Sequence, residues 1–141
     1  VVDTESCLLE ETAELMRWDL TEEGFKLTLS RDIPGVIAAA LPALVERMLT
    51  RHGLSRTAVK HWLIHPGGPR VLNAIETALD LPSDALEPSR ALLRRAGNMS
   101  SATIFGLIEP FLANGNGWAV VVGMGPGLSV EALLLHAAPA A

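Results

Sequence analysis

Two polar side chains in this 141-residue sequence, His65 and Asn98, are candidates for stabilising a negatively charged oxygen of a ligand, because small residues lie next to them. His65 ends an apolar segment and is followed closely by Gly67 and Gly68. Asn98 stands directly after Gly97. Small neighbours let a ligand approach while a regular element holds the side chain. An imidazole N–H and an amide N–H so placed would donate two hydrogen bonds to one oxygen, although each residue alone is more often structural.

Three other patterns favour structural roles. His61 and His65 have the i, i+4 spacing of a zinc-binding helix, but no Glu follows His61 and Pro66 stops a helix. The glycine-rich run 123–127 precedes a strand-like segment, whereas a dinucleotide-binding loop must open a helix. Carboxylates near Cys7, the single cysteine, oppose formation of a thiolate. We therefore expect no metal site, no dinucleotide site and no nucleophilic cysteine in this chain.

The composition indicates one globular domain with an acidic N-terminal quarter. Hydrophobic residues make up 49% of the chain, and 16 Asp and Glu outnumber 11 Lys and Arg for a net charge of −5. Nine of the acids fall within residues 1–35, and no basic stripe of the kind that binds nucleic acid is present. We expect no apolar run of the roughly 18–20 residues that a membrane span needs. These features predict a cytoplasmic protein without nucleic-acid or membrane partners.

The hydrophobic pattern predicts the elements that would position His65 and Asn98. Strands are expected within 24–31 and over 59–64, 118–122 and 128–135, and helices over 34–51, 69–80, 86–95 and 100–113. Asp32 is the expected cap of the first helix, and Ser83 and Ser89 are candidate helix starts. The glycine turn 123–127 predicts a closing hairpin. Strands separated by helices predict an α/β fold with a mixed sheet layered with helices.

Three motifs in the chain resemble those of the chalcone synthase-like type III polyketide synthases. They are HWLIHPGGP at 61–69, GNMSSA at 97–102 and GMGPGLSVE at 123–131. Related ketoacyl synthases share the roles of the His and Asn but not all three motifs. The resemblance spans residues 1–141 and covers only the C-terminal half of the family's thiolase-like fold. Since the first residue is Val1 rather than Met, we expect the chain to be a piece of a longer protein.

The resemblance implies a catalytic role for His65 and Asn98. They would be two members of a Cys-His-Asn triad whose cysteine lies in the missing N-terminal half. That cysteine would receive an acyl group from a coenzyme A (CoA) thioester, and malonyl-CoA would lose carbon dioxide to give an enolate that attacks the acyl thioester. His65 and Asn98 would stabilise the enolate, and His65 would also help to hold the cysteine as thiolate. The resemblance implies no cofactor beyond the CoA thioester substrates.

The resemblance also implies residues that bind substrate or CoA. Arg70 stands where the family often has a basic residue near the CoA phosphates, although an arginine at a helix start is as often merely solvated. Leu27 takes the place of the aromatic gatekeeper of plant chalcone synthases, and Met124 replaces a Phe. The starter unit and the number of extensions of plant chalcone synthases therefore cannot be assigned to this protein by the resemblance. The other implied binding residues are Gly67, Gly68, Ser100, Gly125 and Pro126.

The absence of the catalytic cysteine from this chain leads to expectations about activity and assembly. The whole enzyme is expected to be an acyltransferase and a homodimer, whereas the isolated chain is expected to be inactive. An apolar face left by the missing half should make the chain self-associate or bind that half. The alternative is a non-catalytic thiolase-like module that binds CoA or pairs with another half.

Overall fold

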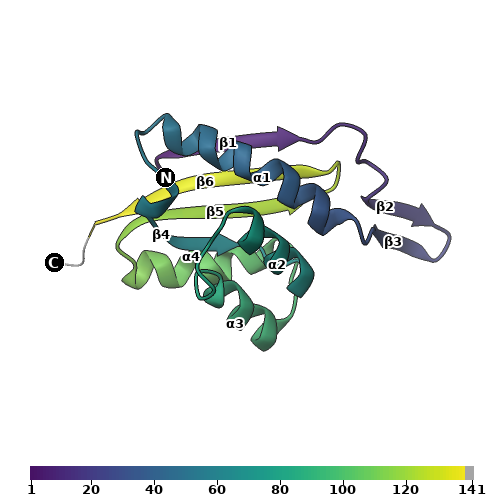
Figure 1. The fold of residues 1–141 in the computed structure, drawn as a ribbon. Coiled ribbons are helices and arrows are strands. Elements are labelled where there is room, and N and C mark those ends of the chain that lie inside the picture. The colour runs from purple at the N-terminus through teal and green to yellow at the C-terminus, as the bar shows by residue number, and fades with distance from the viewer. Residues whose placement is uncertain (139–141) are drawn as a thin grey trace.

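A four-stranded mixed sheet runs through the chain in the computed structural model, which describes residues 1–138 (Figure 1). The strand order is β1-β6-β5-β4, with bounds Asp3–Leu8, Ser129–Ala137, Gly117–Gly125 and Val59–Ile64 respectively. β4 and β5 are parallel, and the other two pairs are antiparallel. This arrangement confirms the predicted α/β fold with a mixed sheet and its closing hairpin.

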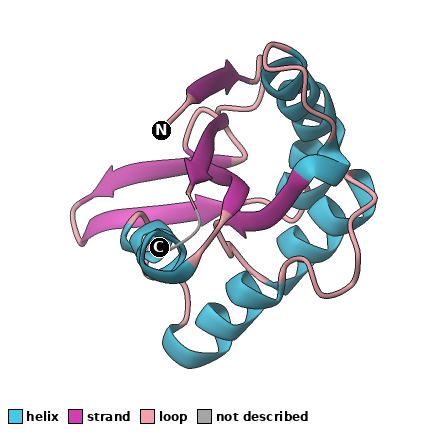
Figure 2. Cartoon of the chain, turned by 90° about the vertical axis from the view of Figure 1, so that its left-hand side faces the viewer, coloured by secondary structure: helices cyan, strands magenta, loops and turns pink. Residues whose placement is uncertain are grey.

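Four α-helices pack against the two faces of this sheet (Figure 2). They are α1 (Ile33–Thr50), α2 (Pro69–Ala78), α3 (Glu87–Ala96) and α4 (Ala102–Asn114), and a short 3-10 helix, η1 (Arg56–Ala58), leads into β4. Each α-helix was predicted from the sequence to within a few residues at its ends.

Side chains of the central strands alternate between two cores, one on each face of the sheet. Trp62 and Ile64 face the core formed with α1 and α2. Leu63 faces a smaller core formed with α4 and with Leu92 of α3. This alternation follows from the two-residue period of a strand. Because both faces are covered, residues 62–64 of β4 and 118–122 of β5 form unbroken apolar runs rather than being apolar at every second residue.

A second, two-stranded sheet projects beyond the main body (Figure 1). It is an antiparallel hairpin of β2 (Met16–Thr21) and β3 (Gly24–Leu29), in which Trp18 lies opposite Leu27. The sequence predicted β3 but did not locate β1 or β2. Trp18 and Phe25 meet edge to face with ring centroids 6.4 Å apart, and both are largely exposed. The hairpin therefore presents apolar side chains without a core of its own.

Helix α1 corrects one expectation from the sequence. By length and composition alone this 18-residue helix is apolar enough to cross a membrane, although no such segment was expected. Its apolar character is explained by packing, because seven of its residues are buried. They are Ile33, Ile37, Leu41, Leu44, Val45, Met48 and Leu49, and they contribute to the larger core.

The predicted helix caps are wrong in detail. Asp32 precedes α1 but makes no side-chain cap bond, because its backbone is already helical and its carboxylate accepts a hydrogen bond from the Ser30 hydroxyl. Ser83 begins no helix. Ser89 lies inside α3, fully buried, where its hydroxyl oxygen accepts a hydrogen bond from the N–H of Ile64 at 3.2 Å. Ser89 thus supports the strand end next to His65.

Candidate active site

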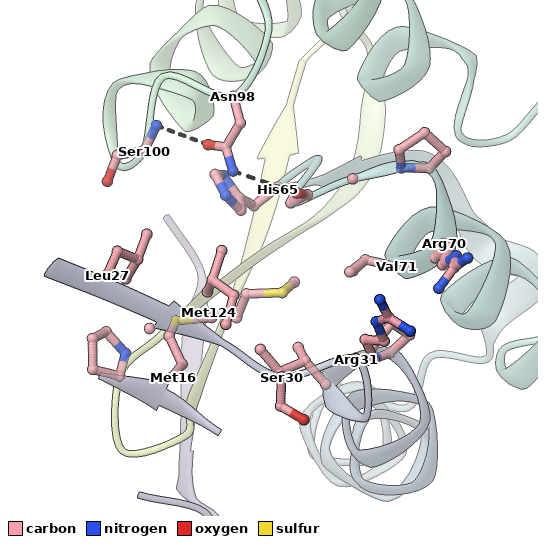
Figure 3. Close-up of a pocket in the computed structure, with 18 of the residues that line it drawn as sticks. Met16, Leu27, Ser30, Arg31, His65, Arg70, Val71, Asn98, Ser100 and Met124 are labelled. Carbon is pink, nitrogen blue, oxygen red and sulfur yellow. Dashed lines mark hydrogen bonds between the residues drawn. The ribbon is translucent and has the colours of Figure 1, made fainter. Parts of the chain in front are cut away.

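Nine residues predicted from the sequence to form the site line one pocket of about 730 Å³ (Figure 3). Its wall comes from the β2–β3 hairpin, the start of α1, the β4–α2 turn, the α3–α4 loop and the β5–β6 turn. The nine residues are Leu27, His65, Gly67, Gly68, Arg70, Asn98, Ser100, Gly125 and Pro126. The structure brings all nine together, and their individual roles stay predictions.

His65 is placed by the carboxyl end of β4. Its N–H continues the pairing with β5 by donating to the carbonyl of Val122 at 2.8 Å, and its carbonyl accepts from the N–H of Gly67 at 2.9 Å. Pro66 and the two following glycines form the turn, and Pro69 then begins α2 with a preset backbone angle. The His65 residue is only 7% exposed, and this burial lowers its pKa. Its imidazole is therefore neutral at neutral pH.

Asn98 is placed by the loop between α3 and α4. Its Oδ1 accepts a hydrogen bond from the N–H of Ser100 at 2.8 Å, which turns Nδ2 toward the β4–α2 turn. Nδ2 lies 3.5 Å from the carbonyl oxygen of Gly67, at the outer limit of a hydrogen bond. Figure 3 shows this amide nitrogen pointing toward the imidazole of His65. The Asn98 amide and the His65 imidazole, each able to donate an N–H, thus lie on the same side of the pocket.

Two arginines, Arg31 and Arg70, line the pocket away from this pair (Figure 3). Within residues 1–138, neither makes an ion pair with a carboxylate, whereas most other arginines do. Both are exposed and belong to helix starts, where the backbone also favours anions. Arg31 was not predicted from the sequence. The feature of the sequence that could have indicated Arg31 is its position directly before Asp32, where the predicted strand gives way to a helix start.

An apolar wall completes the pocket. Met16, Trp18, Leu27 and Leu29 come from the hairpin, and Met124 comes from the end of β5. Only Leu27 and Met124 of these were singled out from the sequence, and Met16 and Trp18 were missed because β2 was not located. The pocket therefore combines converging N–H donors, an apolar wall and unpaired cations, which suits an anionic ligand with an apolar group and a polar reacting centre.

His61 and Cys7, which the sequence analysis considered as a metal ligand and a nucleophile, do not line this pocket. His61 directs Nε2 to the carbonyl of Asn116 at 3.0 Å, and its ring centroid is 5.1 Å from that of Phe111. Cys7 lies on β1 opposite Val130 and outside the pocket. Across residues 1–138 no three His, Cys, Asp or Glu residues gather as metal ligands.

Comparison with known proteins gives one consistent family. Residues 1–139 match the family described as chalcone and stilbene synthases, C-terminal domain. A relative from Bacillus subtilis (strain 168), a candidate chalcone synthase by its name, is 38% identical over 138 residues, which are 95% of this chain and 38% of the relative. The 1,3,6,8-tetrahydroxynaphthalene synthase of Streptomyces peucetius subsp. caesius is 34% identical over 140 residues, which are 96% of this chain and 37% of that enzyme.

A solved structure agrees with the sequence relatives. The crystal structure of PKS-I from the brown alga Ectocarpus siliculosus superposes with a TM-score of 0.87 at 28% identity. The match covers 96% of this chain and 38% of that chain. The chain therefore spans well under half the length of the proteins that it matches.

Proposed function

Because the chain belongs to the chalcone and stilbene synthase family, as its C-terminal domain, we propose that the whole protein is a type III polyketide synthase. It would be an acyltransferase that extends an acyl-CoA starter with malonyl-CoA. The observation that supports this most directly is the convergence of the Asn98 amide and the His65 imidazole in one pocket.

We infer the following reaction from the family and the site. A cysteine thiolate in the N-terminal part attacks the acyl-CoA carbonyl, and CoA leaves as its thiolate. Malonyl-CoA loses carbon dioxide, and the electron pair of the broken carbon–carbon bond forms the enolate of acetyl-CoA. The enolate carbon attacks the enzyme-bound acyl thioester and expels the cysteine thiolate. The product is a β-ketoacyl-CoA longer by one acetyl unit.

His65 and Asn98 would lower the barrier to decarboxylation. The negative charge that develops is on the thioester oxygen of malonyl-CoA, where two fixed N–H donors stabilise it with little reorganisation. Burial of His65 lowers its pKa, so that both donors are neutral before the charge develops. His65 would also help to stabilise the cysteine thiolate during acyl loading. No resident metal or cofactor is needed for these steps.

The pocket mouth would bind the CoA portion of the substrates. Arg70 and Arg31 offer two guanidinium groups to phosphate oxygens, for which their fork of N–H donors is suited. Gly67 and Gly68 present backbone without side chains, and Ser100 adds a hydroxyl beside Asn98. The apolar wall formed by Leu27 and its neighbours would enclose the growing acyl chain.

Helix α4 supports pairing with the N-terminal part of the same protein. It contains a single charged residue, Glu109, and its apolar residues point in all directions. Phe105 and Leu112 are 70% and 68% exposed, although the opposite side of the helix packs on the sheet. A helix that is apolar all round is typically buried on all sides. We propose that the N-terminal part covers this face, and that the whole protein forms a homodimer as the family resemblance implies.

Product formation by the whole protein tests this proposal. Incubation with a set of acyl-CoA starters and malonyl-CoA should yield extended polyketides, identified by mass spectrometry. The matched control is the whole protein with His65→Ala, which should lose both acyl loading and extension. Tight binding of CoA with neither acyl loading nor extension would contradict the proposal and favour a non-catalytic module.

A further inference from the structure

Thr103 lies outside the pocket, yet it contacts the loop that directs Asn98. The amide of Asn98 is oriented by a single strong contact, in which its Oδ1 accepts the N–H of Ser100 at 2.8 Å. Ser100 has a φ of 57°, in the left-handed region that residues other than glycine rarely adopt. Such a conformation persists only where the surrounding structure holds it. The direction of the amide therefore depends on whatever fixes Ser100.

Two hydrogen bonds to Thr103 fix the residues around this strained position. The Oγ1 of Thr103 accepts the N–H of Met99 at 2.9 Å, and its own N–H donates to the carbonyl of Ser100 at 3.1 Å. Thr103 is 0% exposed and sits in the first turn of α4. Ser101, the residue at the usual capping position, makes no side-chain cap bond. Thr103 thus ties the α3–α4 loop to the first turn of α4.

We propose that Thr103 is a positioning residue for decarboxylation, an inference that rests on the proposed function. Thr103 is not among the residues that line the pocket, so it acts only through the backbone of residues 99 and 100. Loss of its hydroxyl releases the N–H of Met99 and lets Ser100 relax from its left-handed conformation. The Asn98 amide then turns away from the enolate oxygen. His65 is unaffected, because it is held separately by β4 and β5.

The inference is tested in the whole protein with Thr103→Val, which keeps the shape of the side chain and removes the hydroxyl. Release of carbon dioxide from malonyl-CoA, per acylated enzyme, should fall by about 10- to 100-fold, as expected for a displaced catalytic group. Acyl loading of the cysteine should stay close to the parental rate. Thr103→Ser keeps the hydroxyl and should restore carbon dioxide release. Should Thr103→Val fail to fold, Thr103→Ala removes the same hydroxyl with a smaller side chain. This variant must show the same slowed carbon dioxide release with acyl loading retained.

A double-mutant comparison separates positioning from a merely structural role. In an Asn98→Ala background, Thr103→Val should cause no further loss of carbon dioxide release, because the group that it positions is already gone. A structural role would instead lower loading and decarboxylation together and would persist in that background. If Thr103→Val or Thr103→Ala releases carbon dioxide at the parental rate while Asn98→Ala releases it slowly, only this inference is overturned. Parental decarboxylation by Asn98→Ala would remove Asn98 from the mechanism and this inference with it, whereas a parent protein that neither loads acyl groups nor extends them would overturn the proposed function itself.

Discussion

His65 and Asn98 reach the pocket by different routes. His65 is held by the parallel pair β4 and β5, through its backbone bond to Val122, and burial lowers its pKa. Asn98 is held by its own loop, through the N–H of Ser100. Burial favours the neutral form of the His65 imidazole and an amide carries no charge, so in the proposed mechanism both would bind a developing negative charge without a preceding protonation step. This difference in support explains why changes near Asn98 should affect decarboxylation more than acyl loading.

Leu27 offers a prediction about the size of the product. It lines the pocket from β3 and is 42% exposed. Leu27→Trp in the whole protein should reduce the space for the growing chain and shift the products toward fewer extensions, while short starters still load at the parental rate. Mass spectrometry of the product mixture measures the shift. Leu20→Trp is the matched control, because Leu20 lies on β2 of the same hairpin outside the pocket and should leave the mixture unchanged. An unchanged mixture from Leu27→Trp would contradict this use of the pocket.

At the scale of elements, the parts nearest His65 were the most predictable. Residues 62–64 of β4 and 118–122 of β5 form unbroken apolar runs because both faces of the sheet are covered there, and the HPGGP motif marks the start of α2. β1 and β2 could not be located, because β1 is an edge strand with acidic residues facing α1, and β2 belongs to an exposed hairpin. Met16 and Trp18 on β2 were therefore missed as pocket residues, and Leu29 and Arg31, at the end of the predicted segment 24–31, were not recognised as facing the pocket. Their proximity to His65 arises only from tertiary packing.

The acidic face of β1 is paired with α1. The Nε of Arg51 donates to Asp3 at 2.9 Å, and Glu5 accepts from both Arg47 and Arg51. Hydrogen bonds from Arg51 and then from His52 lower the pKa of Asp3 to about 2, and Arg51 and Arg47 lower that of Glu5. The unfolded chain binds protons on these carboxyls at higher pH than the folded chain does. Their contribution to stability is therefore full above about pH 4.5 and is lost as pH falls toward 2.

Arg51→Met should weaken this pairing between β1 and α1. We expect a lower urea midpoint at pH 7 and a smaller further loss of stability between about pH 4.5 and 2, since Asp3 and Glu5 then titrate closer to their unfolded values. Urea unfolding across this pH range measures both effects. Arg95→Met serves as the control, because Arg95 makes no ion pair with a carboxylate in the described part of the chain. An equal acid sensitivity of Arg51→Met and the parent would contradict this explanation.

At the scale of the whole molecule, the described chain has a hydrophobic core on each face of its sheet but holds only part of the site that we propose. It covers 38% of the Bacillus subtilis relative, and its single cysteine lies on β1 outside the pocket. The exposed apolar side of α4 and the projecting hairpin are the surfaces that a further part of the protein would cover. Catalysis and solubility of the chain should therefore both depend on that part.

The isolated chain should be catalytically silent and should expose apolar surface. Incubation with a labelled acyl-CoA should leave no stable acyl-enzyme, and a covalent adduct on Cys7 followed by condensation would overturn this expectation. The chain should also bind a hydrophobic dye or self-associate in sedimentation experiments. Replacement of Phe105 and Leu112 by Ser should reduce both effects, because these residues are among the most exposed apolar side chains of α4. A monomer that binds no dye would contradict an uncovered face.

The rate of carbon dioxide release from labelled malonyl-CoA by the whole protein, compared with its Asn98→Ala variant, tests the central claim most directly. Both proteins are loaded with the same acyl starter, and Asn114→Ala, at the end of α4, controls for the loss of an amide outside the pocket. The account predicts a decrease of about 100- to 1000-fold for Asn98→Ala, the usual effect of losing one oxyanion donor, with acyl loading largely retained. Release of carbon dioxide by Asn98→Ala at the parental rate would contradict the account and remove Asn98 from the mechanism.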